Sequence, residues 1–346
     1  MEKGEEGGKG MTQLSVFECA FPSIKTKKKI RLIELFAGIG AQAKALENLG
    51  ADFEHWRVCE YDKYAVKSYN AIHGTSFKPS DIRNIHGKDL EISDLEKYFY
   101  IMTYSFPCQD LSIAGNQRGM KKGQGTRSGL LWEVERILHE LSRCGQLPQM
   151  LLMENVPDVH RKRNVYDFAD WIRSLDDLGY QSYWKDLNAS DFGIPQNRDR
   201  CFMVSVLGRY SFSFPSGLPL KIGLKDILEQ EVDDKYYISE DKERSIREST
   251  FTMRRSLIVT AKDMGGQMHT ITAHDSKETT CVELQNEVER RIRRITPKEA
   301  WRFMGFADED LEKASKVNSN SQLYKQAGNS IVVPVLEAIF KQILDD

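Results

Sequence analysis

The chain of 346 residues has no paired cysteine motif. Its six cysteines lie far apart, no Cys-x-x-Cys occurs, and the seven histidines do not cluster with the cysteines. Structural zinc sites and disulfide frameworks are built on such groupings, so we expect neither a disulfide nor a bound metal. Unpaired cysteines are typical of a reducing compartment, which predicts a cytoplasmic location.

Long apolar runs and an excess of one charge are also missing. No run approaches the length of a membrane span, and the first ten residues, MEKGEEGGKG, lack the apolar core of a secretory signal. Lys and Arg number 49 and Asp and Glu 51, a net charge of −2. A strongly basic chain would point directly to nucleic acid, but a balanced chain can still bind it through one local basic face. Hydrophobic residues make up 40%, enough for a core, which excludes wholesale disorder.

Strand and helix patterns alternate between residues 30 and 186. This alternation predicts an α/β fold built on a doubly wound, mostly parallel sheet. Two further strand patterns, at 181–189 and 200–206, are joined by a long turn and predict an antiparallel hairpin at one sheet edge.

The chain divides into four parts by composition. We expect a flexible extension at 1–29, a first domain at 30–208, and a smaller second domain at 209–295, where the sequence is polar and weakly periodic. Residues 296–346 form a connecting segment and an apolar helix that returns to the first domain.

A glycine turn follows the first expected strand. Phe36 to Gly40 reads FAGIG, and glycines between a strand and a helix let a ligand approach the backbone closely. Glu60 closes the next strand, where an acidic side chain would hold the ribose hydroxyls of an adenosine. A tight packing turn with an unrelated surface glutamate is the alternative. Ala43 replaces the third glycine of a dinucleotide turn, which does not exclude NAD but leaves room for an adenosyl ligand without pyrophosphate.

Two chemically active side chains follow the next two strands. Cys108 lies in a turn fixed by Pro107, where a thiolate could be held over a pocket as a nucleophile. Glu154 ends an apolar strand, where a carboxylate is costly unless it is paired or functional. A buried small cysteine and a turn-capping glutamate are the alternatives. The convergence of Cys108 and Glu154 at one sheet edge favours a catalytic site. The glycine-rich segment 110–129 would then be a mobile lid, with a plain surface loop as the alternative.

Three polar side chains open the last strand of the sheet. Gln196, Arg198 and Arg200 share one face of an extended segment, which predicts a clamp for an anion or a carbonyl. A salt-bridged edge strand is the alternative interpretation.

Taken in order, these segments resemble the motifs of the cytosine-5 DNA methyltransferases of bacterial or phage type. The resemblance covers about residues 30–344 and rests on FAGIG, FPCQ, ENV, QNRDR, RRITPKEAWRFMGF and QAGNSIVVP. Phe106 departs from the two prolines usual in the nucleophile motif. Six motifs in register are far more specific than any one of them.

The resemblance implies a Rossmann-like, S-adenosylmethionine-dependent catalytic domain at 30–208 and a target-recognition domain at 209–295. The enzyme would methylate carbon 5 of a cytosine flipped out of a specific duplex DNA sequence, through a covalent adduct with Cys108. Glu154 would contact ring nitrogen 3, Arg200 would hold the base carbonyl, and Arg198 would brace the site. The implied partner is duplex DNA, and neither a membrane nor an obligate protein partner is implied. The enzyme would be a monomer in the cytoplasm, associated with a bacterial nucleoid.

The resemblance also assigns two sets of binding residues. Those of the S-adenosylmethionine pocket come from the turns at the sheet edge and from the last motif: Phe36, Gly38, Gly40, Glu60, Tyr61, Asp81, Ile82, Pro107, Leu130, Asn329 and Ser330. Those expected at DNA are polar residues around the nucleophile: Gln109, Ser112, Arg127, Gln196 and Thr270.

Three other functions stay open. An RNA cytosine methyltransferase of the same family is usually marked by a Cys-Phe-Thr tripeptide, which is missing from this sequence. An NAD-dependent oxidoreductase leaves FPCQ and ENV unexplained. A catalytically dead DNA-binding regulator is disfavoured by the intact nucleophile motif.

Overall fold

The computed structural model describes residues 21–108, 111, 120–122, 128–241, 243–244, 258–259, 267–272, 281–285 and 290–345. Among these residues, no helix is long and apolar enough to cross a membrane.

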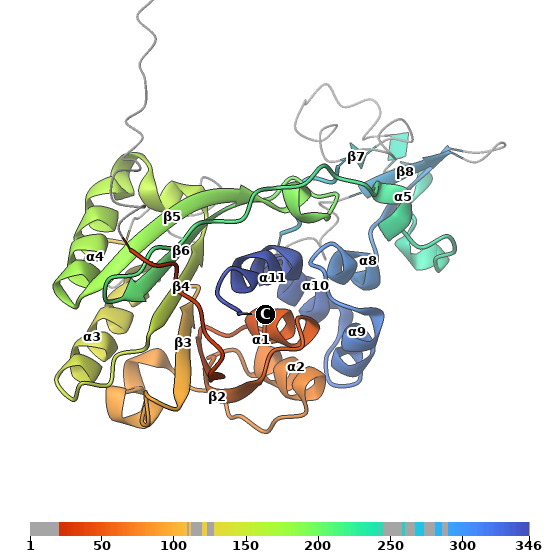
Figure 1. Cartoon of the computed structure of the whole chain (residues 1–346). Helices are drawn as coiled ribbons and strands as arrows, with labels where there is room; N and C mark the ends of the chain where they lie inside the picture. Colours follow the sequence, from red (N-terminus) through yellow and green to blue (C-terminus); the bar gives the residue numbers. More distant parts are fainter. Residues whose placement is uncertain are drawn as a thin grey trace, which may run out of the picture.

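A six-stranded sheet in the order β2-β1-β3-β4-β6-β5 forms the centre of the molecule (Figure 1). β1, β2, β3 and β4 run parallel, whereas β6 is antiparallel to both β4 and β5. The predicted fold class and edge hairpin are therefore confirmed. The strands are β1 (Lys29–Leu35), β2 (Phe53–Cys59), β3 (Tyr98–Tyr104), β4 (Met150–Asn155), β5 (Tyr180–Asn188) and β6 (Asp199–Leu207).

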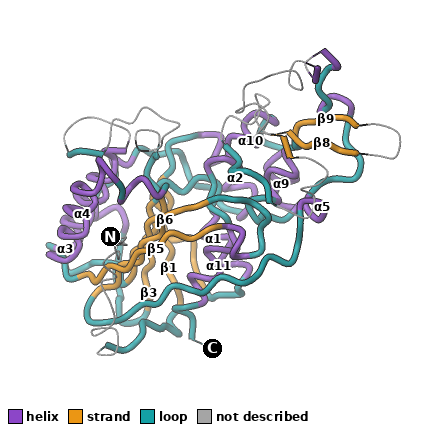
Figure 2. The backbone as a smooth tube through the Cα atoms, turned by 90° about the horizontal axis from the view of Figure 1, so that it is seen from above, coloured by secondary structure: helices purple, strands orange, loops and turns teal. Residues whose placement is uncertain are grey.

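Helices cover both faces of this sheet. Figure 2 shows α3 (Leu131–Ser142) and α4 (Val165–Asp177) on one side, and α1 (Ala41–Asn48), α2 (Lys63–His73) and α11 (Val333–Lys341) on the other. α3 is amphipathic, and the side chains that it directs inward are buried: Leu131, Val134, Ile137, Leu138 and Leu141. The two faces carry separate apolar cores, one around Trp171 and one around Trp301.

The last part of the chain packs against the first. It contains α8 (Pro297–Arg302), α9 (Asp308–Ser315), α10 (Asn320–Asn329) and α11. α11 lies along α1, where Asn48 donates a hydrogen bond of 2.6 Å to Glu337, and α9 lies along α2. The C-terminal segment thereby closes the helical layer beside the glycine turn.

A second, three-stranded sheet lies apart from the first. It comprises β7 (Ile258–Val259), β8 (Cys281–Gln285) and β9 (Arg290–Arg294), and the short α5 (Leu224–Ile227) precedes it in the chain. Arg293 in β9 forms a bidentate ion pair with Glu299 in α8, at 2.6 and 2.8 Å, and both side chains are fully buried. This pair fixes the small sheet to the C-terminal helices.

The expectation of a flexible segment at 1–29 is wrong for residues 21–29. The backbone N–H of Ile24 donates to Ser211 and that of Thr26 to Ile343, and β1 already begins at Lys29. Ile24 is buried, so an apolar side chain anchors this part of the segment. Residues 1–20 lie outside the described part of the chain.

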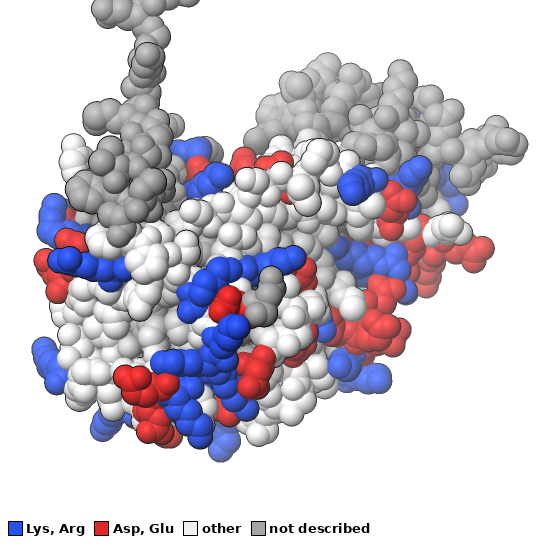
Figure 3. Space-filling model, in the orientation of Figure 1, with Lys and Arg blue, Asp and Glu red and all other residues white. Residues whose placement is uncertain are grey.

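Charges are mixed on the face of the molecule seen in Figure 3. Lys and Arg are interspersed with Asp and Glu there, which matches the balance of the whole sequence. Near the N-terminal end of the described chain, Lys29 lies 3.0 Å from Glu54 and Lys27 lies 3.6 Å from Asp345. Such pairs offset each other's charge locally.

Candidate active site

The two glycines of the FAGIG turn have different neighbours. Both have positive φ angles, 57° at Gly38 and 83° at Gly40, which favour glycine. A Cβ on Gly38 would meet no atom within 4 Å, whereas a Cβ on Gly40 would lie 2.3 Å from Nε2 of His73. Gly38 thus leaves open space for a ligand, and Gly40 is required by the close packing of α2.

Glu60 connects this turn to the start of α2. Its carboxylate accepts hydrogen bonds from the backbone N–H of Gly38 at 2.8 Å and of Asp62 at 2.7 Å. Burial raises the pKa of Glu60, and the two N–H donors oppose that rise. An ionised carboxylate has about four lone-pair positions, so it can still accept bonds from the two hydroxyls of a ribose. Tyr61, the next residue in the chain, is 75% exposed.

The other residues expected at the cofactor lie around this turn or follow it in the chain. Asp81 caps a 3-10 helix (Ile82–Asn84) and is paired with Arg83. Phe36 and Leu130 pack at the margin of the apolar core, Asn329 is exposed, and Ser330 is buried. Ser128 ties the segment of Leu130 to the nucleophile turn, because its hydroxyl donates to the carbonyl of Pro107 at 2.6 Å.

Cys108 lies in the turn after β3, and Glu154 lies near the carboxyl end of the neighbouring strand β4. The side chain of Asn155 donates a hydrogen bond of 2.9 Å to the carbonyl of Phe106, which joins that turn to β4. Glu154 is largely buried and lies 3.2 Å from Nε of Arg200 at the start of β6. The predicted convergence at this sheet edge is therefore present in the structure.

The charges of this group act on one another. Burial raises the pKa of the Cys108 thiol, the negative Glu154 raises it further, and Arg200 and Arg198 oppose both effects. Burial also raises the pKa of Glu154, again against the two arginines. The thiolate and the carboxylate thus compete for the same positive charges, and a protonated Glu154 would favour the thiolate.

The prediction of a three-residue clamp is wrong. Gln196 has no exposed surface, and its amide donates to the carbonyl of Phe303 at 2.8 Å and accepts from the N–H of Ile271 at 3.0 Å. The Arg198 guanidinium donates to three backbone carbonyls, those of Ile271, Gly328 and Ser330, at 2.8 to 3.0 Å. Later segments of the chain cover this face, and no local pattern around residues 196–200 indicates them.

The residues expected at DNA divide into three groups. Buried as it is, Gln196 positions the backbone of segment 268–272 and offers no surface to DNA in this structure. Thr270 is half-buried, and its hydroxyl donates to the carbonyl of Asn197 at 2.6 Å. Gln109, Ser112 and Arg127 lie outside the described residues, as does most of the segment 110–129.

The sequence did not reveal two residues that hold the site together. Asn155 joins the nucleophile turn to β4, and Ser128 ties the nucleophile turn to α3. Asn155 belongs to the ENV motif, so its position was a usable signal. Ser128 lies in a glycine-rich stretch that offers none.

The fold is that of known methyltransferases. The structure aligns with the Entamoeba histolytica methyltransferase EhMeth at a TM-score of 0.74 and 18% identity, over 91% of this chain and 98% of that one. It aligns with the S. pombe Dnmt2 methyltransferase at a TM-score of 0.71 and 22% identity, over 90% and 97%. These likenesses show the architecture alone.

The chain belongs to the C-5 cytosine-specific DNA methylase family, whose model matches residues 30–345. It is 33% identical to the type II methyltransferase M2.ScrFI of Lactococcus lactis subsp. cremoris, over 91% of this chain and 99% of that protein. It is 31% identical to the orphan methyltransferase M.SssI of Spiroplasma monobiae, over 91% and 97%. The family resemblance is confirmed: the chain is a DNA (cytosine-5)-methyltransferase, and the oxidoreductase alternative is excluded.

Proposed function

We propose that this chain transfers a methyl group from S-adenosylmethionine to carbon 5 of a cytosine extruded from a specific duplex DNA sequence, with Cys108 as the nucleophile. The observation that carries the proposal is the meeting of Cys108 with the Glu154–Arg200 ion pair at the ends of adjacent strands. The glycine turn at the end of β1 lies at the same edge of the sheet.

The residues of the turn fit S-adenosylmethionine. The open space above Gly38 leaves room for the ligand to approach the turn closely. The acceptor Glu60 suits the ribose diol of an adenosyl group, and the exposed ring of Tyr61 suits its adenine. Phe36, Asp81, Ile82, Leu130, Asn329 and Ser330 would complete the pocket. When bound, S-adenosylmethionine supplies an electrophilic methyl group.

The protein's part in the chemistry is to activate carbon 5 of the base. The Cys108 thiolate adds to carbon 6, forming a carbon–sulfur bond and making carbon 5 enamine-like. Glu154, whose pKa is raised by burial, places a proton at ring nitrogen 3, and Arg200 holds the base carbonyl. After methylation, water takes the proton of carbon 5 as the carbon–sulfur bond breaks and Cys108 leaves as a thiolate. Ring nitrogen 3 then returns its proton to Glu154.

DNA binding involves the small sheet and the segment that joins it to the site. A base inside a duplex is inaccessible, so it must swing out, at a cost of a few kcal/mol. We propose residues 209–295 as the target-recognition domain and residues 30–208 as the catalytic domain. Segment 268–272 would contact the phosphates of the extruded nucleotide through Thr270, with Gln109, Ser112 and Arg127 as further DNA contacts. The enzyme would act as a monomer.

Trapping with 5-fluorocytosine tests this mechanism. Bisulfite sequencing of DNA from cells that express the protein first locates the methylated sequence. A duplex with 5-fluorocytosine at that position should form an adduct that survives denaturing electrophoresis, because fluorine cannot leave as a cation after methylation. The adduct should require S-adenosylmethionine and Cys108.

The controls separate the remaining alternatives. Cys108→Ala should form no adduct but still bind S-adenosylmethionine, whereas replacing the exposed Cys144 by Ala should change neither property. An adduct with RNA in place of DNA would make the chain an RNA enzyme. Normal methylation of DNA without any adduct would refute addition by Cys108.

A further inference from the structure

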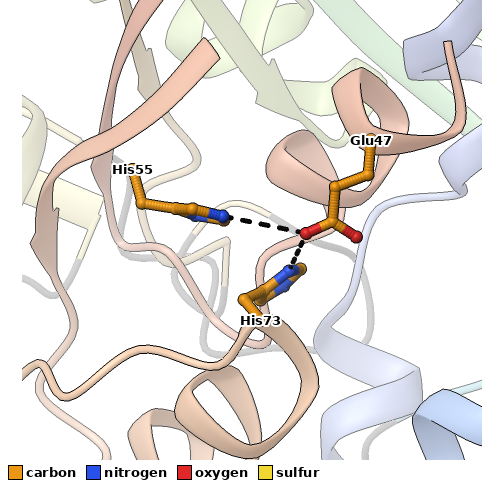
Figure 4. Close-up of side chains that lie close together, drawn as sticks. All are labelled: Glu47, His55 and His73. Atoms are coloured by element: carbon orange, nitrogen blue, oxygen red, sulfur yellow. Dashed lines mark hydrogen bonds and ion pairs between the residues drawn. The ribbon is translucent and has the colours of Figure 1, made fainter. Parts of the chain in front are cut away.

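Three potential metal ligands from three elements meet behind the glycine turn. Glu47 comes from α1, His55 from β2 and His73 from α2, and one ligand atom of each lies within 4.8 Å of the others. Figure 4 shows both imidazole rings directed at the carboxylate of Glu47. The methylation chemistry proposed above uses none of these side chains.

The hydrogen bonds of His73 fix which of its nitrogens faces Glu47. Nε2 lies 3.2 Å from the carbonyl oxygen of Ile39, which only accepts, so Nε2 carries a hydrogen. Nδ1 then points at Oε1 of Glu47, 2.7 Å away. A position between an imidazole nitrogen and a carboxylate oxygen holds either a proton or a metal ion.

The hydrogen bonds of His55 likewise fix which of its ring nitrogens carries the hydrogen. The hydroxyl of Tyr69 donates to the buried Glu34 at 2.5 Å, so its oxygen accepts the hydrogen of His55 Nδ1, 2.8 Å away. With its hydrogen on Nδ1, His55 directs Nε2 at Oε1 of Glu47, 3.7 Å away, an arrangement that a cation would stabilise.

We propose that Glu47, His55 and His73 bind one divalent zinc-class ion through Oε1, Nε2 and Nδ1. Two histidines and one carboxylate form a ligand set typical of zinc. Metal-binding histidines usually donate their second ring N–H to a carbonyl or another polar group, as His73 does to Ile39 and His55 to Tyr69. Tetrahedral ligand atoms lie about 3.3 Å apart for bonds of about 2.0–2.1 Å. To take the ion, the Glu47–His73 pair would widen from 2.7 Å and the Glu47–His55 pair would close from 3.7 Å.

The surrounding charges permit such an ion. Lys44 lies 3.4 Å from the other oxygen of Glu47, but its ammonium is held at 2.9 Å by the buried Asp310. His73 is fully buried, whereas the side chains of His55 and Glu47 keep 19% and 31% of their surface. The ion would enter from the side of Glu47 and His55 and could take water as a fourth ligand.

A second cluster in the described part of the chain is less suited to a cation. His160, Asp186 and Cys201 also lie close together. However, the guanidinium of Arg161 already occupies Asp186 at 2.7 Å, and burial raises the pKa of the Cys201 thiol. Among the residues that the structure describes, no lysine or arginine is paired with Oε1 of Glu47, the oxygen that would face the metal.

The proposed ion would join α1, β2 and α2 beneath the turn that we assign to the cofactor. His73 bonds to Ile39 and packs against Gly40, so fixing its ring also fixes the back of that turn. The expected role is structural, and it does not depend on the proposed methylation mechanism.

Metal binding is measured on the full, untagged chain. After dialysis against Zn²⁺, mass spectrometry of the metal should give one ion per chain, and Co²⁺ should produce the visible bands of a four-coordinate site. Bound Zn²⁺ should also raise the melting temperature. His73→Gln and Glu47→Gln should abolish all three signals. Tyr69→Phe, which removes the partner of His55, should weaken binding about 10- to 100-fold.

The exposed His139 on α3 provides the matched control, and His139→Gln should bind the ion as the wild type does. Circular dichroism identifies any variant that fails to fold, and His55→Gln then replaces it in the series. The proposal is overturned if the wild-type chain binds no ion, or if the folded ligand variants bind it as tightly as His139→Gln.

Discussion

At the scale of single residues, burial and the negative Glu154 favour the protonated form of Cys108, the nucleophile that we propose. Glu154 and the Cys108 thiol lie in the same positive field of Arg198 and Arg200, and burial disfavours the charged form of both. Any proton that Glu154 acquires increases the share of that field available to the thiolate. Contact of Glu154 with ring nitrogen 3 would therefore link binding of the base to activation of Cys108.

Glu154→Gln should separate these two effects. The variant should methylate DNA about 10²–10³-fold more slowly, because the group that stabilises the developing charge is lost. Its Cys108 pKa should nevertheless fall, since the negative charge that raises that pKa is gone and Arg200 is released. Alkylation of Cys108 by iodoacetamide, followed by mass spectrometry, should thus become fast at lower pH than in the wild type. An unchanged or higher pH midpoint would contradict the coupling.

The two turn glycines provide a second residue-scale test. Gly38→Ala should fold, with a small loss of stability from its positive φ, but should bind S-adenosylmethionine more weakly because the new methyl group fills the ligand's space. Gly40→Ala should destabilise the fold itself, because its Cβ would overlap His73. Calorimetric binding and urea unfolding distinguish the two outcomes. Equal unfolding midpoints for the two variants would contradict the packing role of Gly40.

At the scale of elements, periodicity predicted most strands of the first domain. It did not predict which later segments of the chain pack over them. The strands follow from short-range patterns, which the sequence displays directly. The partners of Arg198 at Ile271, Gly328 and Ser330 lie 73 to 132 residues away, and nothing local announces them. The same applies to Glu47, His55 and His73, whose spacing matches no metal motif and which only the packing of α1, β2 and α2 brings together.

The Arg293–Glu299 pair allows an element-scale prediction. Arg293→Met should cost about 3–5 kcal/mol of unfolding free energy, because removing one partner leaves a buried carboxylate uncompensated. Arg291→Met, two residues earlier on β9, should cost far less. Arg291 is exposed, and its ion pair with the exposed Asp234 is long, at 3.9 Å. Chemical denaturation of the two variants measures the difference. Similar losses would show that Arg293 does not anchor the small sheet to α8.

At the scale of the whole molecule, a chain of net charge −2 must bind a polyanion. Lys and Arg are mixed with Asp and Glu on the face shown in Figure 3, so that face offers no general attraction to DNA. The attraction must therefore come from a local group of cations facing the phosphates. Arg198 is not one of them in this structure, because its guanidinium is directed at backbone carbonyls.

DNA affinity should consequently depend steeply on salt despite the balanced total charge. Each phosphate contact releases condensed counterions, so a site with several contacts should lose about 10³- to 10⁵-fold in affinity between about 50 and 200 mM salt. Fluorescence anisotropy with a duplex that contains the mapped target measures this slope. S-adenosylmethionine binding to the same preparation is the control, because a small ligand releases few ions and should respond weakly. Equal, shallow slopes for DNA and cofactor would contradict a phosphate-binding face and would leave recognition to uncharged contacts with the base.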